Sequence, residues 1–333
     1  MSIFIIAEIG VNHNGNIKLA KKMIEKAKSA GANAVKFQSF IAEDLVTKST
    51  KLAKYQTKGT NKKTMLALLK NYELSKKDQI NLFKFCKKKK IEFMSSAFDK
   101  QSLNFLLTKL KIKKIKIPSG ELTNLPLLID IAKKNRTTLL STGMSNLDEI
   151  YQAIQVLKKN GLSKKNIILL HCNSAYPTPY NDTNLRSINF LRDKFKLKTG
   201  FSDHTIGIEA SIAASAMGAS VIEKHFTLNK KLKGPDHSSS LTPKEFKNMV
   251  ESINCVEKSL GVYGKKVTKS EKTNLKFARK SIVAKIKIKK GEKFKQSNIT
   301  TKRPGNGLSP LNWFKVLNRK AYKNFEKDDL IKI

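Results

Sequence analysis

A chain of 333 residues, 40% of them hydrophobic, is long enough for one large packed domain and a second small one. It has no apolar run of the length that a membrane span needs, and a strand pattern begins at the N-terminus without the segments of a signal peptide. Its cysteines, Cys86, Cys172 and Cys255, lack metal-site spacing and cannot all pair, which favours a reducing compartment. We therefore expect a cytoplasmic protein without a membrane partner.

The formal net charge of +40 raises the question of nucleic-acid binding. Only six of the 66 basic residues are Arg, the side chain that reads bases through two parallel hydrogen bonds. The densest run, Lys87–Lys90, ends a predicted helix, where cations complement the helix dipole. We interpret the excess as a solvated lysine-rich surface that attracts anionic substrates, and we expect no nucleic-acid partner.

Eight short apolar runs, each ending in polar or charged residues, alternate with segments of helical periodicity. The runs are Ile3–Glu8, Ala34–Gln38, Ile91–Ser96, Ile115–Ser119, Thr138–Thr142, Ile167–Asn173, Thr199–His204 and Ser220–His225. This alternation predicts a (β/α)8 TIM barrel of the α/β class, in which catalytic groups lie at the C-terminal ends of the strands. Helix ends are well marked, as at the capping box Thr242–Glu245. Residues 42–70 lack periodicity, and a connection of that length is usually functional or mobile.

The pattern changes after Gly261. Residues 263–280 are polar and charged and predict a linker between a catalytic barrel domain of residues 1–262 and a C-terminal domain of residues 281–333. In the last segment, short strand-like runs alternate with turns such as Pro304–Gly307, so we expect a compact, mostly β module. A module of about fifty residues is near the limit of independent stability, and we expect it to dock onto the barrel or a partner chain.

Two histidines, His204 and His225, end the seventh and eighth predicted strands. In a barrel these ends face one pocket, so the two imidazoles are candidates for ligands of one divalent cation. Two protein ligands leave coordination positions open, and such a metal would act as a Lewis acid on a bound carbonyl. The alternative is that each histidine only satisfies hydrogen bonds within the core.

Two lysines, Lys36 and Lys116, end the second and fourth predicted strands within otherwise apolar runs. A lysine that points into a barrel mouth is costly unless it meets an anion. Ser119, Ser141 and Ser202 add hydroxyl groups at the same rim, a combination that suits a small molecule with a phosphate and a carboxylate. Two alternatives stay open, a Schiff-base lysine as in aldolases and serines that only cap strand ends.

Three carboxylates, Glu8, Glu121 and Glu223, lie at or just after strand ends. They are candidates for contacts with substrate hydroxyls or for proton transfer. For Glu121, simple surface exposure is an equally good reading. His13 is expected to shape the first loop, and His171 is expected to belong to the core.

The combination of these motifs resembles the sialic acid synthase family, and bacterial N-acetylneuraminate synthases in particular, over essentially the whole chain. The segments that carry the resemblance are Ala7–Gly15, Val35–Gln38, Lys116–Glu121, Ser141–Met144, Tyr176–Pro179, Ser202–His204, Glu223–Thr227 and Lys302–Gly307. The resemblance implies a barrel joined to an antifreeze-like (SAF, β-clip) domain. It also implies a homodimer with exchanged C-terminal domains, each covering the partner's active site.

The resemblance further implies an N-acetylneuraminate synthase, a transferase that condenses phosphoenolpyruvate with N-acetylmannosamine and releases phosphate with C–O cleavage. His204 and His225 would bind Mn²⁺ or Mg²⁺, which polarises the sugar aldehyde. Phosphoenolpyruvate would be held by Lys36, Lys116, Ser119, Ser141 and Ser202. The sugar would contact Glu8, Gln38, Tyr176 and Asp236, with Glu121 near the reacting centre and Phe277 and Arg303 supplied by the other subunit. Catalytic roles thus fall to Lys36, Lys116, Glu121, His204 and His225.

Two positions depart from the family pattern. Ser96 keeps a hydroxyl where many members have Thr followed by Pro, and Ser174 replaces an Asn found in some members, and both stay candidate substrate contacts. The segment Gly234–His237 resembles the N-acetylneuraminate and legionaminate branches, which favours a manno-configured amino sugar. The alternative function is a legionaminate synthase that uses 2,4-diacetamido-2,4,6-trideoxymannose, and a metal-dependent aldolase is less favoured.

Overall fold

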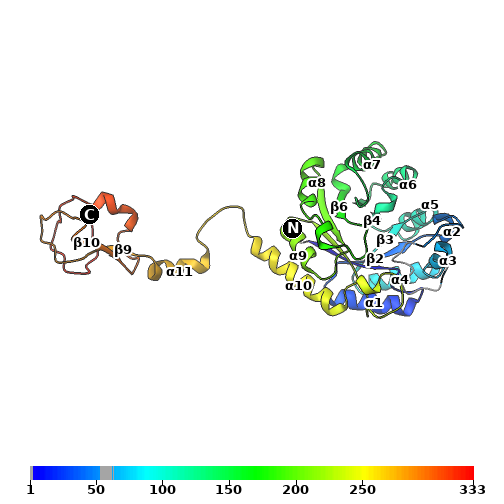
Figure 1. Cartoon of the computed structure of the whole chain (residues 1–333), viewed down its shortest axis with the longest axis horizontal. Coiled ribbons are helices and arrows are strands. Elements are labelled where there is room, and N and C mark those ends of the chain that lie inside the picture. Colours follow the sequence, from blue (N-terminus) through cyan, green and yellow to red (C-terminus); the bar gives the residue numbers. More distant parts are fainter. Residues whose placement is uncertain (1–2, 53–61, 63) are drawn as a thin grey trace. The chain divides into compact units, whose positions relative to one another are not determined.

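The computed structural model describes residues 3–52, 62 and 64–333 of the chain. The chain divides into two compact units, Met1–Gly261 and Val262–Ile333 (Figure 1). Among the described residues, no helix combines the length and the apolar character that crossing a membrane would require.

Eight parallel strands of the first unit close into a barrel in sequence order, with β8 pairing back onto β1. The strands are β1 (Phe4–Gly10), β2 (Ala34–Ser39), β3 (Glu92–Ala97), β4 (Lys114–Ile117), β5 (Thr137–Ser141), β6 (Ile167–Cys172), β7 (Lys198–Asp203) and β8 (Val221–His225). Each overlaps one of the eight predicted runs. The predicted TIM-type barrel is therefore confirmed.

Helices connect these strands and surround the barrel (Figure 1). The α-helices are α1 (Ile17–Ser29), α2 (Ala42–Leu45), α3 (Met65–Lys70), α4 (Lys76–Lys88), α5 (Lys100–Asn104), α6 (Leu125–Ala132), α7 (Leu147–Lys159), α8 (Ser187–Phe195), α9 (Glu209–Ala216) and α10 (Pro243–Leu260). Short turns of other helix types are η1 (Phe105–Lys109), η2 (Ser119–Glu121), η3 (Lys164–Asn166), η4 (Tyr180–Asp182) and η5 (His237–Ser239). At the start of α10, Thr242 and Glu245 form the predicted capping box. The long connection 42–70 contains α2 and α3, while 53–61 and 63 lie outside the described residues.

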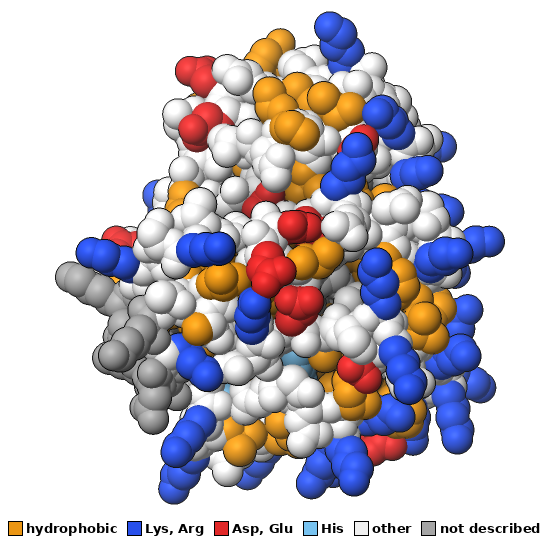
Figure 2. Space-filling view, turned by 90° about the vertical axis from the view of Figure 1, so that its right-hand side faces the viewer, with side chains coloured by type: hydrophobic (Ala, Val, Ile, Leu, Met, Phe, Trp, Pro, Cys, Tyr) orange, Lys and Arg blue, Asp and Glu red, His pale blue; other side chains and the backbone are white. Residues whose placement is uncertain are grey.

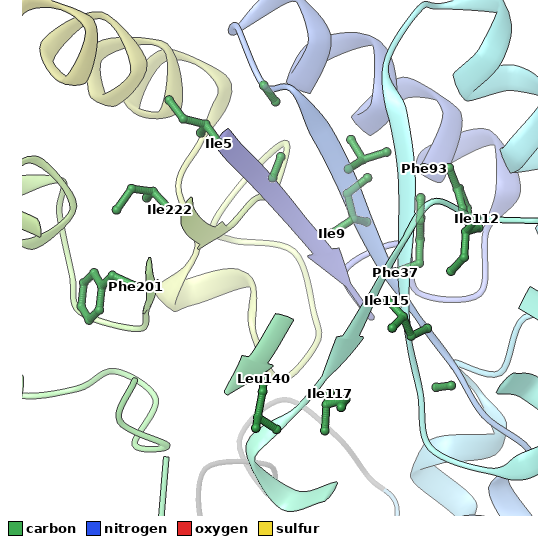
Figure 3. Close-up of a cluster of buried hydrophobic side chains, with 14 of the residues drawn as sticks. Ile5, Ile9, Phe37, Phe93, Ile112, Ile115, Ile117, Leu140, Phe201 and Ile222 are labelled. Carbon is green, nitrogen blue, oxygen red and sulfur yellow. The ribbon is translucent and has the colours of Figure 1, made fainter. Parts of the chain in front are cut away.

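Side chains of the barrel strands alternate between two faces of the wall, as the period of a strand requires. One set packs with the surrounding helices in a large buried cluster, of which Figure 3 shows Ile5, Ile9, Phe37, Phe93 and Phe201 among others. The other set forms a separate buried cluster from six strands, made of Ile6, Ala34, Met94, Leu139, Leu170 and Val221. This second cluster is the apolar floor of the barrel interior.

Two residues further along those six strands, the inward positions become polar or charged. They are occupied by Glu8, Lys36, Ser96, Ser141, Cys172 and Glu223. Because the strands are parallel, these side chains all emerge at the same end of the barrel. The sequence period therefore places a polar layer directly above the apolar floor.

The second unit has a small core of its own around the antiparallel pair β9 (Ser281–Ala284) and β10 (Ile299–Lys302). The buried side chains of this core are Ile282, Ala284, Ile288, Phe294, Ile299, Val316, Ala321, Phe325 and Ile331. Two short helical segments, η6 (Pro310–Asn312) and α12 (Trp313–Val316), complete the module. Most of its remaining backbone is irregular and is held by isolated β-bridges and turns.

The segment 263–280, which the sequence predicts to be a linker, contains the helix α11 (Lys269–Ala278). Thr268 and Glu271 form a capping box at its start. Its C-terminal turn is bonded to the second module, since Gly305 N–H donates to the Lys276 carbonyl at 2.7 Å and Arg303 Nε donates to the Ala278 carbonyl at 3.0 Å. The helix buries no side chain, so it lacks the apolar periodicity that would have revealed it in the sequence.

Lysine and arginine side chains are distributed over much of the face shown in Figure 2, among acidic and apolar groups. In the described part of the chain, exposed lysines pair with acidic side chains, as in Lys70–Glu43 at 2.6 Å and Lys89–Glu25 at 2.7 Å. On this face the positive charge is therefore dispersed.

Candidate active site

The C-terminal ends of the barrel strands surround a cavity of about 400 Å³. Its polar lining consists of Glu8, Lys36, Gln38, Ser96, Lys116, Ser119, Ser141, Cys172, Ser174, Tyr176, Ser202, His204, Glu223 and His225. Leu45, Met65, Leu69, Phe98 and Met144 contribute apolar side chains to its wall. Most of the site residues predicted from the sequence are thus gathered in one cavity.

Four buried charged side chains form the centre of this site. Lys36 Nζ lies 2.9 Å from Glu8 Oε2 and 3.7 Å from Glu223 Oε2. Lys116 Nζ lies 3.1 Å from Glu223 Oε1, and that oxygen also accepts a hydrogen bond from Ser202 Oγ at 2.8 Å. Because each lysine faces a carboxylate, the opposite charges compensate one another and can be buried.

Burial and charge act differently on the two carboxylates. Burial raises the pKa of Glu8 to about 7, although Lys36 opposes the shift. Burial also disfavours the ionised form of Glu223, but Lys116 and Lys36 outweigh it and lower the pKa to about 2. Burial disfavours the charged form of Lys36, yet Glu223 and Glu8 raise its pKa. Glu223 is therefore a permanent counter-charge, whereas Glu8 can exchange a proton near neutral pH.

The two histidines lie side by side, with ring centroids 5.5 Å apart. Burial lowers the pKa of His204 to about 4 and that of His225 well below its ordinary value, so both imidazoles are neutral. His204 Nδ1 contacts the Asn173 carbonyl at 2.5 Å, a bond that makes Nδ1 the protonated nitrogen and leaves a lone pair on Nε2. His225 Nδ1 is buried and has no hydrogen-bond partner.

This donor set fits a divalent cation. Neutral imidazoles are common ligands of such ions, and a hydrogen bond to the backbone fixes the tautomer of His204. Among the described residues, no group of three or more His, Cys, Asp or Glu side chains has the arrangement of a complete metal site. A cation held by His204 and His225 would therefore keep positions open for substrate.

Tyr176 contacts both imidazoles. Its ring lies over that of His204 with centroids 4.1 Å apart, and its hydroxyl is 3.1 Å from His204 Nε2. It meets His225 edge-on at 5.6 Å. Tyr176 is thus placed next to any group bound between the histidines.

The hydroxyl groups of Ser119 and Ser174, which line the cavity, lie close to Gly143. The N–H of Gly143 donates to Ser119 Oγ at 3.1 Å. A Cβ atom at position 143 would lie 2.7 Å from Ser174 Oγ and 2.8 Å from Ser119 Oγ, so only glycine fits without displacing them. Ser141 Oγ is buried without a hydrogen-bond partner, which leaves it available to a ligand.

Comparison with known proteins shows which family the chain belongs to. Residues 23–265 match the NeuB family, and residues 279–333 match the SAF domain. The chain belongs to the sialic acid synthase family. It is 50% identical to the N,N'-diacetyllegionaminic acid synthase of Campylobacter jejuni, over 98% of each chain. It is 45% identical to the enzyme of the same name from Legionella pneumophila, over 93% of this chain and 88% of that one.

A solved structure of the family has the same architecture. The N-acetylneuraminic acid synthetase of Leptospira borgpetersenii is 36% identical to this chain, with a TM-score of 0.72 over 83% of this chain and 90% of that one. Both parts of the predicted fold, the barrel and the C-terminal SAF domain, are therefore confirmed.

Glu121 and Asp236, which resemblance to sialic acid synthases assigns to the site, are not among the residues that line the cavity. Glu121 is half-buried, accepts a hydrogen bond from Asn124 at 2.6 Å, and has a pKa raised by burial. Asp236 lies on the loop after β8, where burial raises its pKa to about 6. Phe277 and Arg303 belong to the second unit, so their roles toward a sialic acid synthase cavity stay predictions.

The structure also assigns positions that the sequence did not distinguish. Glu223 stands out in the sequence only as a strand-end carboxylate, yet it lies between Lys36 and Lys116. The sequence could have indicated its direction, because Glu223 is two residues before His225 and therefore faces the same side of β8. The apolar wall from Leu45 and Met65 had no signal beyond the length of the loop that carries it.

Proposed function

We propose that this protein is a sialic-acid-type synthase that condenses phosphoenolpyruvate with an N-acetylated mannose-type sugar and releases phosphate. The observation that carries the proposal is the presence of two buried lysines and two neutral histidines in one cavity. Two cations match a ligand that has both a phosphate and a carboxylate. Two neighbouring imidazoles are suitable ligands for a divalent cation that activates a carbonyl group.

Each residue has a role in this reaction. Lys36 and Lys116 bind the anionic groups of phosphoenolpyruvate, and Ser119, Ser141 and Ser202 donate hydrogen bonds to them. A divalent cation, Mn²⁺ or Mg²⁺, bound by His204 and His225 would polarise the sugar aldehyde.

The chemical steps follow from that placement. C3 of phosphoenolpyruvate attacks the aldehyde carbon, water adds at C2, and phosphate leaves with cleavage of its C–O bond. Glu8 has a pKa of about 7 and is suited to exchange a proton with the sugar hydroxyl or with water during these steps.

For the sugar, we propose 2,4-diacetamido-2,4,6-trideoxymannose rather than the N-acetylmannosamine that the sequence motifs favoured. The support is the 50% and 45% identity with two N,N'-diacetyllegionaminic acid synthases, against 36% with the N-acetylneuraminic acid synthetase. The apolar side chains Leu45, Met65 and Leu69 in the cavity wall are compatible with a 6-deoxy sugar. N-acetylmannosamine is the second candidate, supported by the likeness to the Leptospira enzyme.

We also propose a homodimer in which Phe277 and Arg303 reach the partner's cavity. Phe277 is 75% exposed, so its ring is accessible to a second chain. Arg303 precedes the turn Pro304–Gly307 and is anchored through Nε to the Ala278 carbonyl, so its guanidinium is held near the end of α11.

The test is a kinetic comparison of the two sugars. The protein is mixed with phosphoenolpyruvate, Mn²⁺ and either sugar, and phosphate release is measured to obtain kcat/KM for each. We expect turnover with both and a preference of at least about tenfold for the diacetamido sugar, since one matched polar or apolar contact contributes roughly 1–3 kcal/mol. A preference for N-acetylmannosamine would reverse the choice of sugar, and no phosphate release with either sugar would end the synthase proposal.

A further inference from the structure

A buried ion pair lies between the strands that carry the two histidines. Lys224 Nζ is 2.9 Å from Asp203 Oδ2, and the side chains are 1% and 0% exposed. Asp203 and Lys224 are also Cα partners in the ladder between β7 and β8. Each is the chain neighbour of a histidine, Asp203 of His204 and Lys224 of His225.

Strand alternation places this pair and the histidines on opposite faces of the barrel wall. His204 and His225 line the cavity, whereas Asp203 and Lys224 do not. Asp203 faces the surrounding helices, because Ser211 of α9 donates a hydrogen bond from Oγ to Asp203 Oδ2 at 2.6 Å. The ion pair therefore lies directly behind the two imidazoles.

Thr205 links the pair to the backbone that follows His204. Asp203 Oδ1 accepts hydrogen bonds from the N–H of Thr205 at 2.8 Å and from its Oγ1 at 2.7 Å. Lys224 Nζ donates to the Thr205 carbonyl at 2.7 Å. Asp203 and Thr205, the two neighbours of His204 in the chain, are thus both bonded to Lys224, which precedes His225. These bonds lie where the β7–β8 ladder ends.

A buried ion pair of this kind fixes the relative position of the two strand ends more than it stabilises the fold. Removing two charges from water costs about as much as their attraction returns, and a well-packed apolar pair often stabilises a fold equally well. An apolar pair, however, has no directional bonds with which to hold two strand ends in one register. A metal site needs such support, because residues behind the ligands orient them.

We propose that the Asp203–Lys224 pair, together with Thr205 and Ser211, is a positioning device that sets the separation of His204 and His225 for a shared divalent cation. The inference rests on the metal site of the proposed function and adds the residues that shape it. None of the four residues touches the cavity, so their effect reaches the cation only through the two histidines.

The test measures Mn²⁺ binding to the metal-free full-length protein by electron paramagnetic resonance, without any turnover. The double variant Asp203→Asn/Lys224→Met removes both charges, nearly preserves volume and keeps an oxygen to accept from Thr205. We expect it to keep its thermal transition near that of the wild type and to bind Mn²⁺ roughly 10- to 100-fold more weakly.

A matched control removes another ion pair of the same barrel. Lys114 and Glu92 lie at the first residues of β4 and β3, 2.6 Å apart and outside the cavity lining. The variant Glu92→Gln/Lys114→Met should bind Mn²⁺ as the wild type does. If it loses affinity to the same extent as the double variant, general loosening of the barrel is the cause and the inference is overturned.

A milder variant keeps the inference testable if the double variant does not fold. Ser211→Ala removes one hydrogen bond to Asp203 from helix α9 and changes no charge. We expect a loss of Mn²⁺ affinity of a few-fold, about the effect of one hydrogen bond. Wild-type affinity in every folded variant of the group overturns the positioning role and leaves the proposed function intact, whereas a wild-type protein that binds no Mn²⁺ overturns the metal site itself.

Discussion

Lys116 Nζ lies 3.1 Å from Glu223 Oε1, and both side chains are only 4% exposed at the mouth of the barrel. A buried ammonium needs a counter-charge, and Glu223 supplies it in the absence of substrate. An incoming phosphate or carboxylate therefore competes with Glu223 for Lys116 or joins both in a larger network. The relationship links the stability of the barrel mouth to its affinity for anions.

Replacing either lysine should weaken phosphoenolpyruvate use far more than sugar use. We expect Lys36→Met and Lys116→Met to raise the KM for phosphoenolpyruvate by about ten- to a hundredfold, because a charge-assisted contact contributes roughly 1.5–3 kcal/mol. Steady-state phosphate release with each substrate varied in turn measures both KM values. Lys114→Met, at the start of β4, is the control and should change neither value. Trapping of pyruvate on Lys36 or Lys116 by borohydride would instead establish an aldolase with a Schiff base.

Removing either histidine should abolish both metal binding and turnover. His204→Ala and His225→Ala each leave one imidazole at the site, which is too few for a stable complex when no third protein ligand is grouped with them in the described chain. Mn²⁺ titration and phosphate release measure the two losses, and circular dichroism checks the fold. As a control, His171→Gln should still bind Mn²⁺, because His171 bonds to the Thr183 carbonyl outside the cavity. Full turnover of wild-type protein in chelator-treated, metal-free buffer would contradict the prediction.

The stability of the protein should depend on pH through Asp236. Burial raises the pKa of this carboxyl from 3.8 to about 6 in the folded state. Between these values the folded protein retains a proton that the unfolded chain has lost, so stability from this group falls as the pH rises through about 6. Above that pH the buried carboxylate destabilises the fold by at most roughly 3 kcal/mol, the equivalent of about two pKa units.

Asp236→Asn removes this titration. Urea unfolding at pH 8 should show the variant to be more stable than the wild type, with the difference shrinking toward pH 4.5. An equal difference at both pH values would show that Asp236 does not titrate between them in the folded protein.

Mixing two inactive variants should restore activity if the C-terminal domains are exchanged between subunits. Arg303→Ala loses the guanidinium that each subunit would lend to its partner, and His204→Ala loses a metal ligand in its own barrel. A hybrid dimer contains one barrel with intact histidines that faces an intact Arg303, so we expect up to about a quarter of wild-type activity at equal mixing and full exchange. Phosphate release is the readout, and mass spectrometry of the intact dimers confirms exchange. If hybrids form and no activity returns, Arg303 does not act across subunits.

The amino-acid sequence was sufficient to predict the barrel and most of the polar residues that line its cavity. The eightfold alternation of apolar runs and helical segments specifies a parallel barrel, because both periods are local properties of the backbone. The same period of two places Glu8, Lys36 and His225 on the inner face at strand ends. Motifs of the sialic acid synthase family then indicated the roles of these residues, and the change of pattern after Gly261 indicated the second module.

Other features depend on contacts between distant parts of the chain. The place of Glu223 between two lysines, the ion pair between Asp203 and Lys224, and the apolar wall from the loop after β2 all join residues far apart in sequence. The helix α11 was missed because it has no buried face.

Sequence by itself determined which residues form strands and which of their side chains face the barrel interior, since these follow from local periodicity. Only the tertiary structure decided which charges neutralise one another and at which pH each carboxyl group loses its proton. Those properties depend on distances of a few ångströms and on burial, and both are set when the barrel closes and brings β1 against β8. Glu8 and Glu223 show the difference, because they are alike in sequence position yet have pKa values of about 7 and about 2.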